Sequence, residues 1–176
     1  LRALIDWSYD LLPPKERSLF QQLSVFAGGW TLEAVEAVGT GREVERSDVL
    51  DLQTHLVEKS LVTMEIGGGR YRMLDTVRHY AQERLGESGD VSPTCTRHLD
   101  FYLTFAETAR PELAGPGQGT WLGRLDLERE NLLAAHAWSE HAHAGTETAL
   151  RLVHALRPYW ISRGQMTLGH RMSLDL

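Results

Sequence analysis

The fold is decided by residues 47–85, which read SDVLDLQTHLVEKSLVTMEIGGGRYRMLDTVRHYAQERL. The stretch opens with apolar side chains at helical spacing, and a β-rich run follows from Ser60 to Ile66. Three glycines, Gly67 to Gly69, then supply a tight turn, and the remaining residues return to helical spacing. A helix that leads into a glycine-turned hairpin and then into a second helix is the order of a winged helix.

The same stretch predicts where the elements begin and which side chains they bury. Ser47 is expected to cap a helix that runs to Lys59, and Asp75 or Thr76 is expected to cap the closing helix. In the hairpin, apolar residues alternate with polar ones, so one face is expected to be buried and the other largely wet. The alternating residues on the first strand are Val62, Met64 and Ile66, opposite Leu61, Thr63 and Glu65.

The residues before this stretch predict further helices. Pro13 and Pro14 are expected to end a first helix and to start a second one, which should stop at Gly28 and Gly29. Thr31 is typical of an N-cap for a short helix. The apolar faces of these helices are expected to carry Leu1, Leu4, Ile5, Leu12, Leu19, Phe20, Leu23, Phe26, Leu32, Val35 and Val38.

A polar, turn-rich run from Gly86 to Pro93 is the best domain boundary in the chain. We therefore predict a winged-helix domain over residues 1–88 and a helical domain over residues 94–176, which the C-terminus truncates. The fold class is mainly α: helices plus one β-hairpin, followed by antiparallel helical pairs of an α-solenoid. In the second domain, Trp121 to Leu133 are expected to form one helix with the charged run from Asp126 to Glu130 on its solvated side.

Composition excludes several classes of protein. The 176 residues include 42% hydrophobic ones, enough for a proper core, and no run approaches the roughly 18 apolar residues of a membrane span. Cys95 is alone and cannot form an internal disulfide, so the cytoplasm is the expected location. A net charge of −6 argues weakly against a protein that coats nucleic acid. Without an initiating Met or a helix stop at its end, the chain is interpreted as a fragment.

Four blocks resemble the winged-helix segment of STAND-class (NB-ARC-like) signalling ATPases, as found in bacterial transcriptional regulators. They are LRALIDWSYDLLP from Leu1, FQQLSVFAGGW from Phe20, LVEKSLV from Leu56 and YRMLDTVRHYA from Tyr71. The run from Trp121 to Trp138 is similar to the helical region that follows in these proteins. The third helix of the second half, with Leu156, Trp160, Gly164 and Gly169, is similar to a tetratricopeptide repeat that breaks off early.

This resemblance implies a regulatory role. In the family, the winged helix packs on an upstream nucleotide-binding domain of the same chain, and a Met-His-Asp motif near its end senses ADP. The matching residues here are Met73, Leu74 and Asp75, so a leucine without a hydrogen-bond donor replaces the histidine. Asp75 is then expected to cap the helix and hold the domain interface, and Arg72 and Arg78 are the nearest candidates for phosphate contacts.

The chain itself contains no phosphate-binding loop, because nothing matches Gly-x-x-x-x-Gly-Lys-Ser/Thr. We therefore expect no catalytic residues and no cofactor in this fragment, whereas the full-length parent would bind ATP or ADP. The leading hypothesis is a non-catalytic regulatory fragment: the winged helix holds the nucleotide domain, and the helical repeats sense a protein or small-molecule effector.

Two alternatives remain. A winged helix can bind DNA through the helix at residues 47–59, but Asp48, Asp51 and Glu58 against Lys59 leave that helix at −2, with Gln53 and Thr54 as its uncharged readers. DNA is therefore an unlikely partner, although the wing and closing helix have a basic edge formed by Arg70, Arg72, Arg78 and Arg84. A helical interaction scaffold is the second alternative.

Other residues were weighed as sites. Trp160 is a candidate for a peptide groove on the solenoid, while the five tryptophans otherwise most simply serve the core. His136, His141 and His143 are close in sequence, but they fall at a helix end and are interpreted as solvated, so no metal site is expected.

Overall fold

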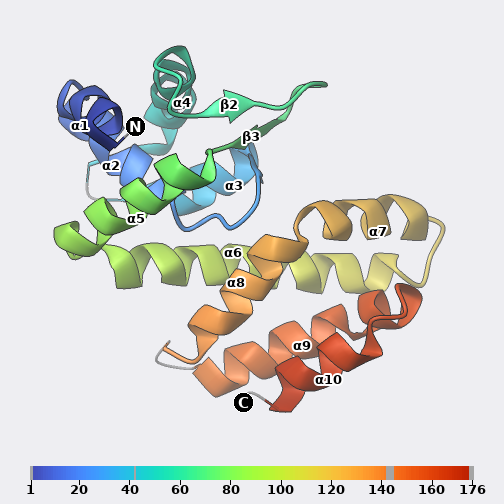
Figure 1. The fold of residues 1–176 in the computed structure, drawn as a ribbon. Coiled ribbons are helices and arrows are strands. Elements are labelled where there is room, and N and C mark those ends of the chain that lie inside the picture. The colour runs from blue at the N-terminus through green and yellow to red at the C-terminus, as the bar shows by residue number, and fades with distance from the viewer. Residues whose placement is uncertain (1, 42, 142–144, 175–176) are drawn as a thin grey trace. The chain divides into compact units, whose positions relative to one another are not determined.

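The computed structural model describes residues 2–41, 43–141 and 145–174, and Figure 1 shows their fold. The chain divides into two compact units, Leu1–His98 and Leu99–Leu176. The division lies within a helix, ten residues after the turn at Gly89, whose φ is +79°. None of the described helices combines the length and the apolar character that crossing a bilayer requires.

The first unit contains the helices and the hairpin of a winged helix in the predicted order, together with a short strand and a 3-10 turn that were not predicted. They are α1 (Arg2–Asp10), α2 (Pro14–Leu23), β1 (Trp30–Thr31), α3 (Leu32–Val38), a 3-10 turn η1 (Arg46–Asp48), α4 (Val49–Glu58), β2 (Thr63–Met64), β3 (Arg70–Arg72) and α5 (Asp75–Ser88). The strands form an antiparallel sheet in the order β1-β3-β2, in which Trp30 pairs with Tyr71 and Thr63 pairs with Arg72. The mainly helical fold class is confirmed.

The core of this unit is aromatic and aliphatic. Phe26 stacks on Trp30 with ring centroids 5.3 Å apart, and the Trp30 indole N–H donates to the Gln53 side-chain oxygen at 3.3 Å. Burial of such side chains stabilises the fold by about 2 kcal/mol each. The fully buried residues around this pair include Leu19, Phe20, Leu23, Val35, Val38, Val49 and Leu56.

Local signals in the sequence located some helix ends and missed others. Pro14 opens α2, and the Thr31 hydroxyl accepts from the Ala34 N–H at 3.3 Å, as predicted. However, α2 ends at Leu23, well before Gly28. The predicted caps at Ser47 and at Asp75 or Thr76 are wrong, because Asp48 and Leu74 hold the N-cap positions and neither makes a side-chain cap bond.

The predicted buried face of the hairpin is also wrong in part. Leu61 and Val62 are both buried, so the chain does not alternate there, while Met64 is 56% exposed and Ile66 is fully exposed. The physical reason is length: paired strand residues end at Met64, and beyond it the wing extends away from the core (Figure 1). Leu4 and Trp7, expected on the buried side of the first helix and in the core, are each 66% exposed.

The second unit is helical. The chain continues through α6 (Val91–Glu112), α7 (Gln118–Leu127), α8 (Arg129–Ser139), α9 (Gly145–Ser162) and α10 (Met166–Leu174). The single helix predicted from Trp121 to Leu133 is wrong, since the chain breaks at Glu128 between α7 and α8. Glu128 is buried rather than solvated, because its carboxylate accepts from the Tyr102 hydroxyl at 2.7 Å and the Asn131 amide at 2.8 Å.

Candidate functional site

The helix-turn-helix with its wing is the candidate site. Helices α3 and α4 are joined by residues 39–48, and α4 occupies the position of the second helix, followed directly by the β2–β3 hairpin (Figure 1). Val49, Leu52 and Leu56 bury one side of α4 against the unit, which fixes the orientation of the other side. The side chains that α4 leaves exposed are Leu50, Asp51, Thr54, His55 and Glu58.

Gln53 does not belong to this exposed set. It is only 1% exposed, and its side-chain oxygen accepts from Trp30. Gln53 was predicted as an uncharged reader of DNA, and that prediction is wrong because the residue stabilises the core. Thr54 is exposed, but its hydroxyl donates to the Leu50 carbonyl at 2.8 Å, within the same helix.

The positive charges beside α4 are paired with acids of the same unit. The Glu16 carboxylate of α2, only 4% exposed, lies 3.1 Å from His55 Nδ1 and accepts a short hydrogen bond from the Lys59 ammonium. Lys15 pairs with Asp48 at 2.6 Å, and this hydrogen bond raises the pKa of Lys15 and lowers that of Asp48. With Asp48 and Lys59 both paired, Asp51 and Glu58 leave the exposed face of α4 at −2, the same balance that the sequence gives.

The wing is a short hairpin, with strands of two and three residues, and it carries an exposed apolar side chain next to its turn. Gly67, Gly68 and Gly69 all have positive φ, +106°, +75° and +83°, a conformation that side chains rarely adopt. Ile66 stands next to this turn and is fully exposed. Arg72, at the end of β3, is exposed, whereas the Arg70 side chain is 13% exposed and lies 3.9 Å from the Glu65 carboxylate.

The residues that matched the Met-His-Asp motif do not converge on one point. Met73 is buried at 5% exposure, while Leu74 is 53% exposed and precedes α5. Asp75 is the first residue of α5, where its charge is favoured by the helix dipole without a cap bond. Arg78, one turn later, has a buried Nε without a hydrogen-bond partner in the described chain.

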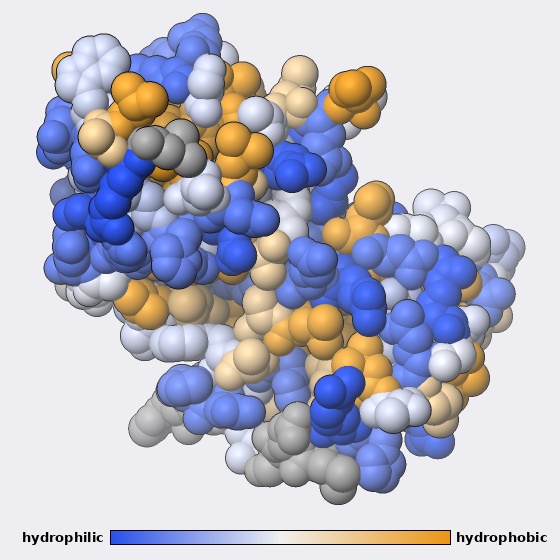
Figure 2. Space-filling model, in the orientation of Figure 1, coloured by the Kyte–Doolittle hydropathy of each residue, from blue (hydrophilic) through white to orange (hydrophobic). Residues whose placement is uncertain are grey.

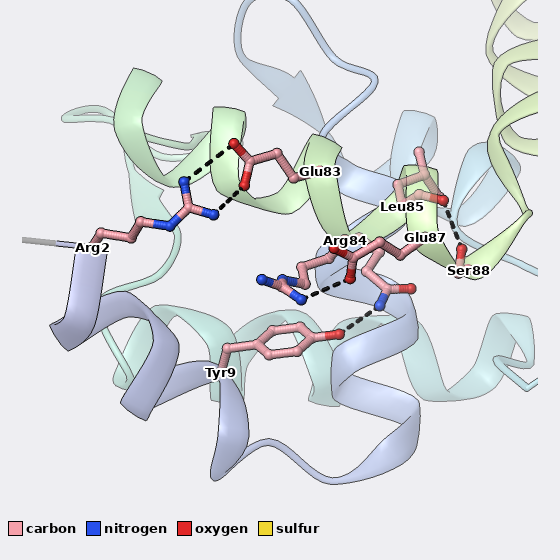
Figure 3. A network of polar contacts seen from close by, with 8 residues as sticks. Arg2, Tyr9, Glu83, Arg84, Leu85, Glu87 and Ser88 are labelled. Atoms are coloured by element: carbon pink, nitrogen blue, oxygen red, sulfur yellow. Dashed lines mark hydrogen bonds and ion pairs between the residues drawn. The ribbon is translucent and has the colours of Figure 1, made fainter.

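Asp75 and Arg78 do share the lining of one open cavity of about 500 Å³ between α1 and α5. Arg2 and Glu83 form part of the same lining, and the Arg2 guanidinium bonds the Glu83 carboxylate at 2.6 Å. Figure 3 shows this ion pair bridging α1 and α5. The cavity is lined by both signs of charge, so it has no clear preference for a phosphate.

Tyr9 of α1 contacts both α2 and α5: Figure 3 shows its hydroxyl bonded from α2, and the Arg84 guanidinium of α5 lies 6.0 Å from its ring centroid. Gln21 donates to the Tyr9 hydroxyl at 2.6 Å, and Arg84 lies over the Tyr80 ring at 5.0 Å while it pairs with Glu87 at 2.7 Å. Burial, with a hydrogen bond to Asp6, raises the pKa of Tyr80 to about 12. Arg84, one residue of the predicted basic edge, is therefore engaged in contacts within the unit.

In the second unit, Trp160 is 4% exposed and packs against α10 at Gly169. Its predicted role at a peptide groove stays a prediction, although one edge of the ring lines a cavity between α9 and α10. His136 is buried, with Nε2 2.9 Å from the Met172 carbonyl, so it is not solvated as expected. His143 lies outside the described residues, and within them no three acid, histidine or cysteine side chains gather as metal ligands.

Sequence reasoning missed Glu16, the buried partner of His55 and Lys59. A signal was present, since Lys15 and Glu16 lie on the first turn of a helix that faces α4, but charge alone does not tell which acid is buried. It also missed His154, Arg157, Met166 and His170 as neighbours of Trp160.

Comparisons with known proteins agree with the fold. Residues 12–86 match the model of a winged helix-turn-helix domain. The chain is 42% identical over 171 residues to a "putative HTH-type transcriptional regulator" of Mycobacterium tuberculosis and to one of Mycobacterium bovis; the match covers 96% of this chain and 19% of each relative. An uncharacterized protein of M. tuberculosis is 42% identical over 101 residues, 56% of this chain and 26% of that protein.

No solved structure matches the chain. The chain contains a winged helix-turn-helix domain and is homologous to these proteins, and it spans about a fifth of the length of the regulators, 19%.

Proposed function

We propose that this chain is the winged helix-turn-helix segment of a transcriptional regulator and that the segment binds DNA. The observation that carries the proposal is the arrangement of α3, α4 and the β2–β3 wing, together with the match of residues 12–86 to a winged helix-turn-helix domain. The proposal is supported by relatives that align with 171 residues of this chain and are named as transcriptional regulators.

The exposed side chains define how DNA would be contacted. With α4 in a major groove, Thr54 and His55 face base edges, and Asp51 and Glu58 accept hydrogen bonds from cytosine amino groups. Acidic side chains at the base edges need basic side chains beside them, because the negatively charged DNA phosphates attract only cations. Arg72 on the wing is exposed and forms no ion pair with the described residues, so it is the leading phosphate contact.

Fluorescence anisotropy with a labelled, mixed-sequence duplex at low salt tests this function. Arg72→Glu is expected to weaken binding by about tenfold or more, since it replaces an attraction to phosphate with a repulsion. Arg110→Glu makes the same charge change on an exposed residue of α6 and should leave affinity within about twofold. Failure of the unaltered chain to bind at low salt, or equal losses in both variants, would reject DNA binding.

A second candidate is favoured by the charge of α4 and by the surface of α1. In this candidate, the winged helix packs on an upstream nucleotide-binding domain of an ATP- or ADP-binding parent. Leu4 and Trp7, one turn apart on α1, are each 66% exposed, and Leu11 in the turn after this helix is 60% exposed, so these apolar side chains favour a protein neighbour. Figure 2 shows apolar side chains reaching the surface of this unit among hydrophilic ones.

This second candidate is tested by charge reversal in the longer regulator. Asp75→Arg should raise basal transcriptional output, because it removes a negative charge from the face that holds the nucleotide domain. Glu33→Arg, on the exposed side of α3, is the matched control and should leave output unchanged. Unchanged output in both variants would count against packing of the winged helix on a nucleotide-binding domain.

In either candidate, we propose that the helical unit senses an effector. Its helices pack in consecutive pairs, as α8 packs with α9 and α9 with α10, the arrangement of repeat proteins that present binding surfaces.

A further inference from the structure

The second unit contains an open cavity of about 370 Å³ between α9 and α10, within the range of small-molecule sites. Its walls are mainly apolar: Leu150, Val153, Trp160 and Met166. A cavity that is apolar over most of its lining and carries a few polar groups at one side is the usual form of a ligand pocket.

The shape of the cavity is held by the contact between Trp160 and Gly169. A Cβ at position 169 would lie 2.5 Å from the Trp160 ring, so only glycine lets α10 approach the indole this closely. The turn between the helices is fixed as well, because Gly164 has a φ of +66° and the Gln165 N–H donates to the Trp160 carbonyl at 2.8 Å. The aromatic wall is therefore preorganised.

The polar groups of the lining are all basic. They are Arg157, His154 and His170, and no acidic side chain lines the cavity among the described residues. The Arg157 side chain is exposed and has no hydrogen bond or ion pair within the described part of the chain, unlike Arg151 and Arg163, which pair with Glu107 and Asp126. An unpaired guanidinium beside an apolar wall is complementary to a carboxylate or sulfonate on an apolar body.

We propose that this cavity binds a small anionic amphiphile: an apolar or aromatic body lies against Trp160, and its acid group pairs with Arg157. The inference names the chemical class of the effector proposed for the helical unit and rests on that proposal for its regulatory meaning. Binding is measured directly, so a ligand that binds without changing regulation would separate failure of the effector role from failure of the site.

The test uses two fluorescent probes with related ring systems, anionic 1-anilinonaphthalene-8-sulfonate and neutral N-phenyl-1-naphthylamine. The chain should bind the anionic probe about tenfold more tightly, since one charge-assisted hydrogen bond accounts for a factor of that size. Decanoate should displace the probe and decanol should displace it poorly. Equal affinity for the two probes, or no saturable binding, would overturn the proposal.

Variants assign the binding to this cavity. Arg157→Gln should weaken the anionic probe about tenfold and leave the neutral probe unchanged, and Leu150→Glu, at an exposed wall position, should also exclude the anion. Arg171→Gln removes an exposed charge on α10 outside the lining and is the matched control. All three changes lie at exposed positions, and circular dichroism checks that the variants stay folded.

A loss in Arg171→Gln equal to that in Arg157→Gln would show general charge attraction and overturn the site. Sedimentation of the unliganded chain tests whether a second copy of the chain covers the cavity instead of a small molecule. A concentration-dependent dimer that blocks the probe would assign the apolar walls to a second copy of the chain and would also overturn the proposal.

Discussion

Two buried carboxylates fix local geometry in this protein, one where α2 contacts α4 and one at the break between α7 and α8. Glu16 lies under α4 at 4% exposure and contacts both His55 and Lys59. Glu128, at 6% exposure, stands at the break between α7 and α8 and accepts from Tyr102 and Asn131. A buried carboxylate is costly without such partners, so each one selects a single local geometry.

Replacing Glu16 tests how much its contacts with His55 and Lys59 stabilise the fold. Glu16→Gln removes the charge while it keeps the side chain's size, and we expect a loss of about 1–2 kcal/mol in the free energy of unfolding. The estimate is below that for a fully buried pair because His55 and Lys59 are 51% and 38% exposed. Urea unfolding followed by circular dichroism measures it. Glu33→Gln, on the exposed side of α3, should change stability by less than about 0.5 kcal/mol, and equal losses would contradict the argument.

Cys95 provides a second prediction at this scale. Burial raises the pKa of its thiol to about 11, a shift that nearby Arg97 only partly opposes. Because the thiolate is the reactive form, the native chain should react slowly with Ellman's reagent at pH 8 and faster as pH rises toward 11. In urea, where the burial is lost, the thiol should react rapidly at pH 8. Rapid reaction of the folded chain at pH 8 would contradict the burial argument.

At the scale of elements, the sequence predicted what depends on neighbours in the chain. The proline at the start of α2, the Thr31 cap and the glycine turn of the wing are local features, and each was placed correctly. Gln53 as a core residue and Glu128 as a helix-breaking acceptor depend on partners far away in the sequence, such as Trp30 and Tyr102. Helical periodicity carries no information about such partners.

The same reason explains which parts of the candidate site were anticipated. The hairpin and α4 were located from their pattern, but the pairing of Lys59 with Glu16 and of Arg84 with Glu87 was not. The exposure of Leu4 and Trp7 on α1 was missed because an apolar helix face is expected to be buried unless another signal indicates an interface.

Two glycines in helices of the second unit should respond oppositely to the same change. Gly169→Ala forces a methyl group to within 2.5 Å of the Trp160 ring, so α10 or the indole must move, at a cost of about 1–3 kcal/mol. Gly123→Ala, on α7, meets no atom within 4 Å and should stabilise by about 0.5–1 kcal/mol through helix propensity. Thermal unfolding gives both values. A stabilised Gly169→Ala variant would show that α9 and α10 are not held together through this contact.

At the scale of the whole molecule, charge limits any encounter with DNA. The chain carries a net charge of −6, and residues 1–98 hold 15 acidic and 11 basic side chains, a balance of −4. Several cations around α4 are already paired: Lys15 with Asp48, Arg46 with Glu36, and Lys59 with Glu16. Attraction to phosphate therefore depends on few residues, Arg72 first among them.

This balance predicts a shallow salt dependence. If Arg72 and one further cation reach phosphates, the plot of log Kobs against log salt concentration should have a slope of about −1 to −2, because each neutralised phosphate contributes about −0.9. Arg72→Gln should reduce the slope by about 1. Anisotropy titrations across a salt series measure both slopes. A slope near −4 would mean that the ion pairs of Lys15, Arg46 and Lys59 open on DNA, whereas a slope near zero would contradict the phosphate contact of Arg72.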